Sequence, residues 1–241
     1  MSRLIAICIP IVKGKEAEFR KFTEDLNGRY YNDFAATRKR FNVRERAFHQ
    51  VMPQAEYVIV TLEGDNPEDA ILHMGEGNDD YTRWFVQKVK EIHNFDITRP
   101  DEIELPELIA DSKTQPTEET QTNNKLIAMA VPITPGKEDE WHEFIEDLRD
   151  RYYDDFAASR ERLNVRERGY NQVTPEGEVV IVTLEGPNPE EALLHFGEGN
   201  DDFTRWFSRK VKEIHNYDLN APPPFSIPQL VVDSMKQKVK V

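Results

Sequence analysis

The amino-acid sequence predicts an α+β protein that is built from two copies of one domain. Shifting the chain by 122 positions aligns Leu4 with Leu126 and Trp84 with Trp206 without a gap, and most aligned residues are identical. Within each copy, short runs of apolar and β-branched residues alternate with longer segments in which apolar residues recur every three or four positions. A repeat of this length indicates a duplicated structural unit, so we expect the same fold in both copies.

The repeat divides the chain into three segments. The two copies occupy residues 1–111 and 125–241, and each is long enough to bury a core of its own. Residues 112–124 between them contain no aliphatic or aromatic side chain, so this segment has nothing to bury. We therefore expect two domains that are joined by a polar linker.

The first copy begins with a strand and a long helix. Residues Leu4–Ile11 form a nearly continuous apolar run, which is typical of a buried strand. Over Lys15–Phe41 the apolar residues recur at helical spacing, and the corresponding stretch Lys137–Leu163 contains no glycine. The pattern predicts one uninterrupted amphipathic helix in each copy.

A hairpin, two helices and a last strand follow. Val43–Val51 and Tyr57–Leu62 alternate or are β-branched, which predicts two paired strands. Asn66, followed by proline and two acids, marks the start of a short helix, and Asp79 or Asn78 caps another that ends near His93. The segment Leu105–Asp111 is expected to form a short edge strand.

This order of strand, helix, strand, strand, helix, strand is that of the split βαβ, or ferredoxin-like, sandwich. The helices can cover only one face of such a sheet, and the other face needs a partner. The second copy on the same chain can supply it. We therefore expect two tandem ferredoxin-like (βαββαβ) domains that pack as an intramolecular pseudo-dimer, with further homo-oligomers left open.

The composition argues against nucleic acid and membrane partners. The chain has 45 acidic and 31 basic side chains and a net charge of -14, which repels phosphate backbones and anionic lipid. Its apolar run Leu4–Ile11 is far shorter than the roughly 20 residues that a membrane span needs. The single cysteine, Cys8, cannot form an intramolecular disulfide. A cytoplasmic protein is expected.

In its element order and in the segment DYTRWFVQKVKEIHNFD, which begins at Asp80, each repeat resembles the dimeric α+β barrel superfamily, including its antibiotic-biosynthesis-monooxygenase-like members. The resemblance implies two sheets that pack face to face as an α+β barrel. It also implies a choice of activities, because the superfamily includes cofactor-free monooxygenases, enzymes that degrade or use haem, polyketide cyclases and stand-alone domains.

A tryptophan and a histidine on the last helix are what the haem-degrading members would suggest. Those enzymes place both residues in one pocket, together with an asparagine from the first strand. At 100° per residue, however, Trp84 and His93 lie on opposite flanks of this helix, and the first strand has no asparagine. The sequence therefore favours a site without a cofactor, with haem as the alternative. The other interpretations are a core-edge role for Trp84 and a helix-terminal cation for His93.

One acid lies unexpectedly on the apolar stripe of the predicted first helix. With Leu26 at the centre of the stripe, Asp33 falls beside Tyr30, and Asp155 does so in the second copy. A buried acid without a partner has a raised pKa and can act as a general base. Alternatively an arginine neutralises it, or a kink in the helix exposes it.

These observations predict two groups of site residues, each present in both copies. The expected catalytic residues are Asp33, His93, Tyr30, Asp155, His215 and Tyr152. The expected substrate-binding residues, which include paired arginines suited to oxyanions, are Arg44, Arg46, His73, Trp84, Arg166, Arg168, His195 and Trp206. No metal is expected, because the acids that follow His73 are explained by helix capping.

The sequence therefore predicts a small-molecule enzyme with one pocket per repeat for an apolar or aromatic substrate. Its acid/base chemistry would need no cofactor, and oxygenation and cyclisation are both compatible with it. The alternative is a non-catalytic ligand-binding or assembly domain whose pocket is filled by side chains.

Overall fold

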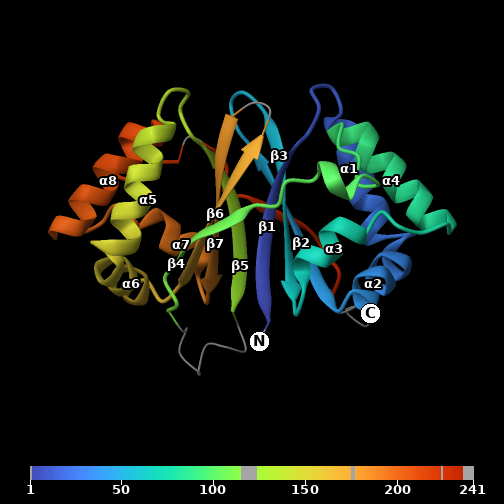
Figure 1. Ribbon diagram of the computed structural model, residues 1–241, viewed down its shortest axis with the longest axis horizontal. Helices are drawn as coiled ribbons and strands as arrows, with labels where there is room; N and C mark the ends of the chain where they lie inside the picture. The colour runs from blue at the N-terminus through green and yellow to red at the C-terminus, as the bar shows by residue number, and fades with distance from the viewer. Residues whose placement is uncertain (1, 115–123, 175–176, 224, 236–241) are drawn as a thin grey trace. The chain divides into compact units, whose positions relative to one another are not determined.

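The computed structural model describes residues 2–114, 124–174, 177–223 and 225–235 (Figure 1). The chain forms two compact units: unit 1 comprises Met1–Leu105 and Gln229–Val241, and unit 2 comprises Pro106–Pro228. Each unit contains a four-stranded antiparallel sheet and, in its described residues, four α-helices. The α+β class is therefore confirmed, and both units are consistent with ferredoxin-like halves.

Unit 1 has the strand order β1-β3-β2-β8. Its elements are β1 (Arg3–Pro10), α1 (Glu16–Asn27), α2 (Tyr31–Arg40), β2 (Val43–Val51), β3 (Glu56–Gly64), α3 (Pro67–His73), α4 (Asp80–His93) and β8 (Gln229–Asp233). In Figure 1 the helices of the unit lie on one side of its sheet. Helix α4 begins at an Asp79 cap that accepts a hydrogen bond from the Thr82 amide, as an aspartate in this position commonly does.

Unit 2 repeats this arrangement with the strand order β4-β6-β7-β5. Its elements are β4 (Glu107–Asp111), β5 (Lys125–Pro132), α5 (Glu138–Asp150), α6 (Tyr153–Arg162), β6 (Arg166–Thr174), β7 (Gly177–Gly186), α7 (Pro189–Leu194) and α8 (Asp202–His215). A short 3-10 helix at Pro100–Glu102 precedes β4 in the chain.

The compact units do not follow the repeat boundaries that the sequence suggested. Strand β4 comes at the end of the first repeat but pairs with β6 of unit 2, and β8 at the end of the second repeat pairs with β2 of unit 1. Each unit is thus completed by a strand from the other repeat. The last strand of each repeat forms its hydrogen bonds with the sheet of the other unit and not with the sheet that precedes it in the chain. Residues 115–123, most of the predicted linker, lie outside the described residues.

The prediction of one uninterrupted helix over Lys15–Phe41 is wrong. The helix ends at Asn27 and a new one begins at Tyr31, and the second repeat breaks at the equivalent place without a glycine. The Tyr30 amide donates to the Asp25 carbonyl at 2.9 Å, and the Tyr152 amide makes the same bond. This link spans five residues instead of four, so it inserts one extra residue and rotates everything that follows.

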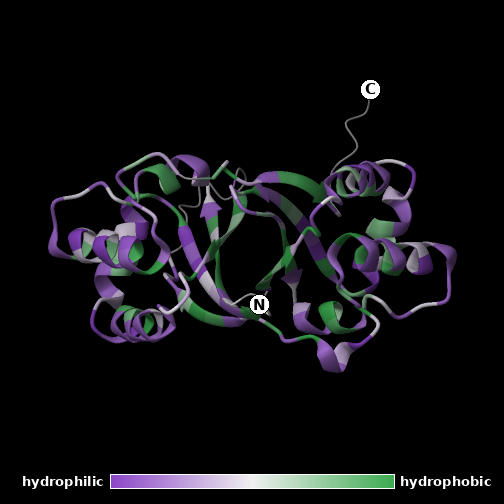
Figure 2. Cartoon of the chain, turned by 90° about the horizontal axis from the view of Figure 1, so that it is seen from above, coloured by the Kyte–Doolittle hydropathy of each residue, from purple (hydrophilic) through white to green (hydrophobic). Residues whose placement is uncertain are grey.

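The core of each unit lies between its helices and its sheet. In unit 1, Phe19 and Phe22 of α1 and Phe85 of α4 pack onto the inward-facing residues of β2 and β3. Figure 2 shows hydrophobic residues along the strands of both sheets. On the opposite face of the sheet, Phe48 and Ile59 are buried as well. Among the described residues, no helix is both long enough and apolar enough to cross a bilayer.

Candidate functional site

Unit 1 encloses an apolar cavity of about 70 Å³ between the helices and the sheet. Most of its wall comes from aliphatic and aromatic side chains, which include Ile7, Phe22, Val58, Met74, Phe85, Val89 and Val232. Three polar side chains also reach it, namely Thr23, Glu45 and His93. A cavity that holds benzene measures roughly 150 Å³, so a ligand of one ring enters only when lining side chains move.

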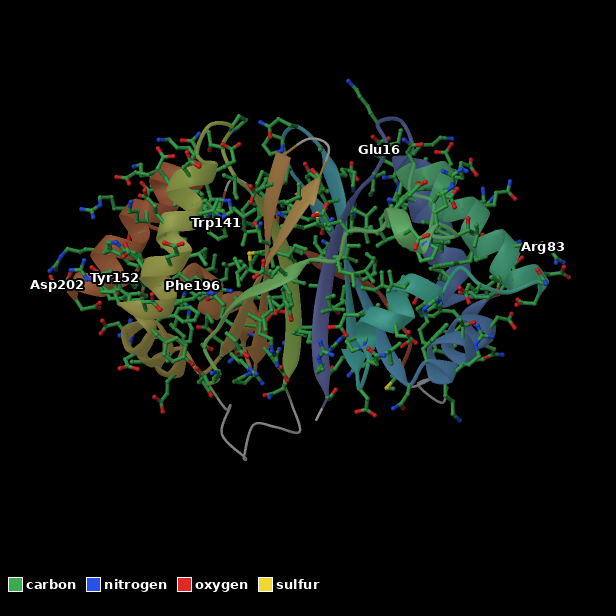
Figure 3. All side chains as sticks on the ribbon, in the orientation of Figure 1. Glu16, Arg83, Trp141, Tyr152, Phe196 and Asp202 are labelled. Carbon is green, nitrogen blue, oxygen red and sulfur yellow. The ribbon has the colours of Figure 1, made fainter. Side chains whose placement is uncertain are left out.

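Unit 2 has a matching cavity of about 80 Å³ in the equivalent place. Its wall includes Met129, Trp141, Phe144, Phe196, Phe207 and Val211, and its polar residues are Glu167 and His215. Trp141 and Phe196, labelled in Figure 3, both lie on the helix side of the unit-2 sheet. The two cavities therefore share one design, an apolar wall with one histidine and one glutamate.

His93 is held in one tautomer at the wall of the unit-1 cavity. Its Nδ1–H donates to the carbonyl oxygen of Pro10 at 2.9 Å, which leaves Nε2 as a hydrogen-bond acceptor. Burial lowers the pKa of His93 to about 4, so the ring is neutral at neutral pH. His215 makes the same bond to Pro132 at 3.0 Å, and burial lowers the pKa of His215 too.

A buried ion pair, which the sequence analysis missed, lies at the wall of each cavity. The Arg38 Nε donates to Glu45 Oε2 at 2.6 Å, and the two side chains are 1% and 7% exposed. Arg160 and Glu167 form the same pair at 2.5 Å. A signal for it was present in the sequence, because Glu45 interrupts the inward-facing apolar residues of β2 and a buried acid requires a cation.

The predicted general base does not lie in the cavity. Asp33 and Asp155 are both exposed, so the expectation that they lie on the buried stripe is wrong. The rotation introduced at Tyr30 brings Phe34 and Arg38 inward in place of Asp33. The sequence left two alternatives to a buried base, namely an ion pair with an arginine and exposure through a kink in the helix. The structure shows exposure at a break in the helix.

The predicted tyrosines and tryptophans pair with each other away from the cavity walls. The rings of Tyr30 and Trp84 lie 4.1 Å apart between centroids, and the guanidinium of Arg29 lies 4.7 Å from the Tyr30 ring. Tyr152 and Trp206 repeat this contact at 4.1 Å. Among the described residues, neither pair lines the cavity of its unit.

The predicted substrate-binding arginines lie on the face of the sheet opposite the cavity, where each forms an ion pair with an acidic side chain. Arg44 pairs with Asp233 and Arg46 with Glu63. In unit 2 the same bonds join Arg166 with Asp111 and Arg168 with Glu185. Arginine in such pairs already has its carboxylate, so these four residues are not in position to bind a ligand in the cavity.

His73 and His195 lie outside the cavities and are partly exposed. His73 Nδ1 lies 2.8 Å from Glu76, which raises the pKa of His73, and His195 has the equivalent contact with Glu198. Within the described part of the chain, no group of three or more histidine, cysteine, aspartate or glutamate residues is arranged to hold a metal ion. Of the predicted site residues, the structure brings only His93 and His215 to the cavity walls.

A haem group does not fit this arrangement. Trp84 and His93 do not share a cavity, and about 70 Å³ is far too little space for a porphyrin ring.

No protein-family model matches the chain, and no curated protein is significantly similar to it. Among solved structures, the chain is similar to that of a Fusobacterium nucleatum protein with a provisional assignment as a monooxygenase. The two are 12% identical with a TM-score of 0.44, over 96% of this chain and 93% of the other.

Proposed function

We propose that each unit binds one small apolar molecule, up to the size of a single ring, in the cavity between its helices and its sheet. The observation that carries this proposal is the recurrence of the same cavity in both units, with a neutral histidine at the same point of the wall. Concave apolar sites with a few fixed polar groups are the usual form of a small-molecule site.

The histidine favours a ligand with a hydroxyl group. Nε2 of His93 is an acceptor in an apolar surrounding, where a phenol or alcohol would donate a hydrogen bond to it. With a pKa of about 4, His93 is a weak base, whereas a phenol has a pKa near 10. Full proton abstraction would thus be uphill by about 8 kcal/mol, since each pKa unit is worth about 1.36 kcal/mol. Binding is therefore better supported than base catalysis.

An enzymatic version of the proposal, with oxygenation or cyclisation of the bound molecule, would use His93 and His215 as the proton acceptors. It would require a substrate whose proton is more acidic than that of a simple phenol. Asp33 and Asp155 are not part of this version, because both are exposed.

The proposal retains the intramolecular pseudo-dimer, in which the two sheets meet as an α+β barrel. Its support is the apolar character of Phe48 and Ile59, which lie on the face of the unit-1 sheet that the helices leave open. Apolar side chains on such a face need a second apolar layer.

The test follows the methionine methyl groups by NMR while phenol or fluorobenzene is added. Met74 lines one cavity and Met129 the other, so each unit has its own reporter. We expect both signals to shift with each probe, and phenol to bind more tightly because it can donate to the histidine.

Cavity-filling variants provide the control. Val89→Phe should abolish the response of Met74 alone, and Val211→Phe that of Met129 alone, because these residues occupy equivalent places in the two walls. Val12→Phe adds the same bulk at an exposed position and should change neither response. No response in the native protein, or responses that persist in both filled variants, would favour the non-catalytic assembly domain.

A further inference from the structure

Unit 1 contains two buried hydrogen-bond donors that its own residues leave unused. Nη1 of Arg38 and the hydroxyl of Tyr81 have no hydrogen-bond partner in the described chain, although the residues are only 1% and 6% exposed. Burial raises the pKa of Tyr81, so its hydroxyl keeps its proton at neutral pH. Arg38 and Tyr81 lie near enough to interact electrostatically, but no contact between them has the geometry of a hydrogen bond that would occupy Nη1 or the hydroxyl. Unpaired buried donors are rare and call for an acceptor.

Both donor residues contact side chains that line the cavity, and the Tyr81 ring stacks on Phe85 with the centroids 5.8 Å apart. The Arg38 guanidinium is held between the rings of Phe34 and Phe85, at 4.7 and 4.8 Å from their centroids. Its Nη2 donates weakly to the sulfur of Met74 at 3.9 Å, and its Nε is bound to Glu45. Phe85, Met74 and Glu45 all line the cavity. Met74 is unbranched and flexible, so its movement would open the cavity toward Arg38.

We propose that this end of the unit-1 cavity binds the carbonyl oxygen of a neutral ligand such as a small ketone, with Arg38 Nη1 and the Tyr81 hydroxyl as donors. This inference rests on the proposed function of the cavity and names the ligand class for unit 1. The ligand is neutral because Glu45 already balances the charge of Arg38, and a second anion beside Glu45 would be repelled. Two donors that converge on one carbonyl oxygen resemble an oxyanion hole in their effect.

Unit 2 lacks this arrangement even though its ion pair is the same. Phe203 replaces Tyr81 and has no hydroxyl, while Phe196 replaces Met74 and places its ring centroid 4.0 Å from Cζ of Arg160. One Arg160 nitrogen also donates to Ser159 Oγ at 3.0 Å. Nη2 of Arg160 also has no hydrogen-bond partner, but the Phe196 ring packs against the guanidinium and no tyrosine supplies a second donor. The unit-2 cavity should therefore accept apolar ligands without preference for a carbonyl.

The test compares cyclopentanone with methylenecyclopentane, in which a CH₂ group replaces the carbonyl oxygen. Both are titrated into the full chain, with Met74 and Met129 methyl signals reporting on units 1 and 2. We expect cyclopentanone to bind unit 1 at least about tenfold more tightly than its hydrocarbon counterpart, and unit 2 to show no such preference. Cyclopentanecarboxylate should bind unit 1 more weakly than the ketone.

Residues exchanged between the units make the matched variants. Tyr81→Phe should remove the preference in unit 1 and still fold, because phenylalanine occupies that place in unit 2. The double variant Phe196→Met with Phe203→Tyr should create the preference in unit 2. Equal binding of both probes to native unit 1, or a preference that Tyr81→Phe leaves intact, would overturn the inference while the cavity proposal stands. Failure of both probes to bind either unit would overturn both.

Discussion

Arg44 and Asp233 form a two-bond ion pair although they are 189 residues apart in the sequence: Nε lies 3.1 Å from Oδ1 and Nη2 lies 2.7 Å from Oδ2. Beside it, Ser234 and Glu45 exchange hydrogen bonds through the serine hydroxyl and both backbones. Arg166 and Asp111 repeat the pair in unit 2. The terminal strand of each repeat is therefore anchored in its sheet by the same set of bonds.

The anchoring aspartates should make the protein acid-sensitive. Burial alone would raise the pKa of Asp233, but the bonds from Arg44 and the Met235 amide outweigh it and hold the pKa below its usual range. The stabilisation is complete well above the pKa of an unfolded aspartate, about 3.9, and is lost as the pH falls through the lower folded pKa. Asp233→Asn should lower the free energy of unfolding by about 1–3 kcal/mol at pH 7 and by much less at pH 2, as measured in urea. A loss of equal size at both pH values would contradict this account.

The exchanged strands predict how an isolated repeat behaves. A fragment of residues 1–114 keeps β4 but lacks β8, so its own sheet has no strand beside β2. Two such fragments can complete each other, because Asp111 is the equivalent of Asp233 and can pair with Arg44 of the other copy. We expect a dimer in light scattering, which Asp111→Asn should weaken. A stable monomeric fragment would show that the repeat can close on itself.

The element order could be predicted because each element has a clear period in the sequence. The destination of the last strand could not, because LPELIAD at the end of the first copy and IPQLVVD at the end of the second suit either sheet. Both end in the aspartate that an arginine of β2 or β6 requires. Local sequence thus specifies the strand and its anchor but leaves open which of two equivalent sheets receives it.

The candidate site was only partly predictable because one backbone bond changes the helix register. At about 100° per residue, an unbroken helix places Asp33 near Leu26 and turns Phe34 about 80° away. The five-residue link at Tyr30 adds nearly one residue of rotation, so Phe34 and Arg38 become buried and Asp33 becomes exposed. Helix α4 has no such break, so the angular positions that an ideal helix predicts for its residues, including His93, apply to it.

The buried pair of Arg38 and Glu45 should be essential to the stability of unit 1. Glu45→Gln removes the balancing charge and leaves a buried guanidinium, which costs about 3–5 kcal/mol. The matched control is Asp25→Asn, which breaks the surface pair with Arg29, whose side chain is 59% exposed, and should cost about 1 kcal/mol or less. Urea denaturation of both variants tests this difference. Similar small losses would indicate that water reaches the guanidinium.

His93 should make stability depend on pH in the mildly acidic range. Burial lowers its pKa to about 4, whereas an unfolded histidine has a pKa of about 6.5, so the unfolded chain binds the proton first. The stability associated with a neutral His93 is complete above pH 6.5 and declines toward pH 4, by about 3 kcal/mol in total.

The measurement is the free energy of unfolding in urea between pH 4.5 and 7. His93→Gln should reduce the dependence on pH and leave the part that His215, whose pKa burial also lowers, contributes. His73→Gln is the control, because Glu76 raises the pKa of His73 and its loss cannot remove a decline of this sign. An unchanged slope in His93→Gln would mean that His93 is accessible to solvent.

Gly169 offers a test of the unit-2 cavity wall, since its equivalent in unit 1 is Ala47 and both residues line their cavities. A Cβ at Gly169 would lie 3.6 Å from Ala110 Cβ and 3.7 Å from Ile109 Cγ1, which are ordinary contact distances. Gly169→Ala should therefore fit without strain and raise the free energy of unfolding by about 0.4–1 kcal/mol, because alanine restricts the unfolded chain. The added methyl group also reduces the volume of the cavity, so the Met129 signal should report weaker binding of fluorobenzene while the Met74 signal is unchanged.

The reverse substitution, Ala47→Gly, should have the opposite effects in unit 1 and lower the free energy of unfolding by about 0.5–1 kcal/mol. If Gly169→Ala instead destabilises the protein, the exchanged strand β4 lies too close to β6 at this point to accept a side chain, and the cavity cannot extend there.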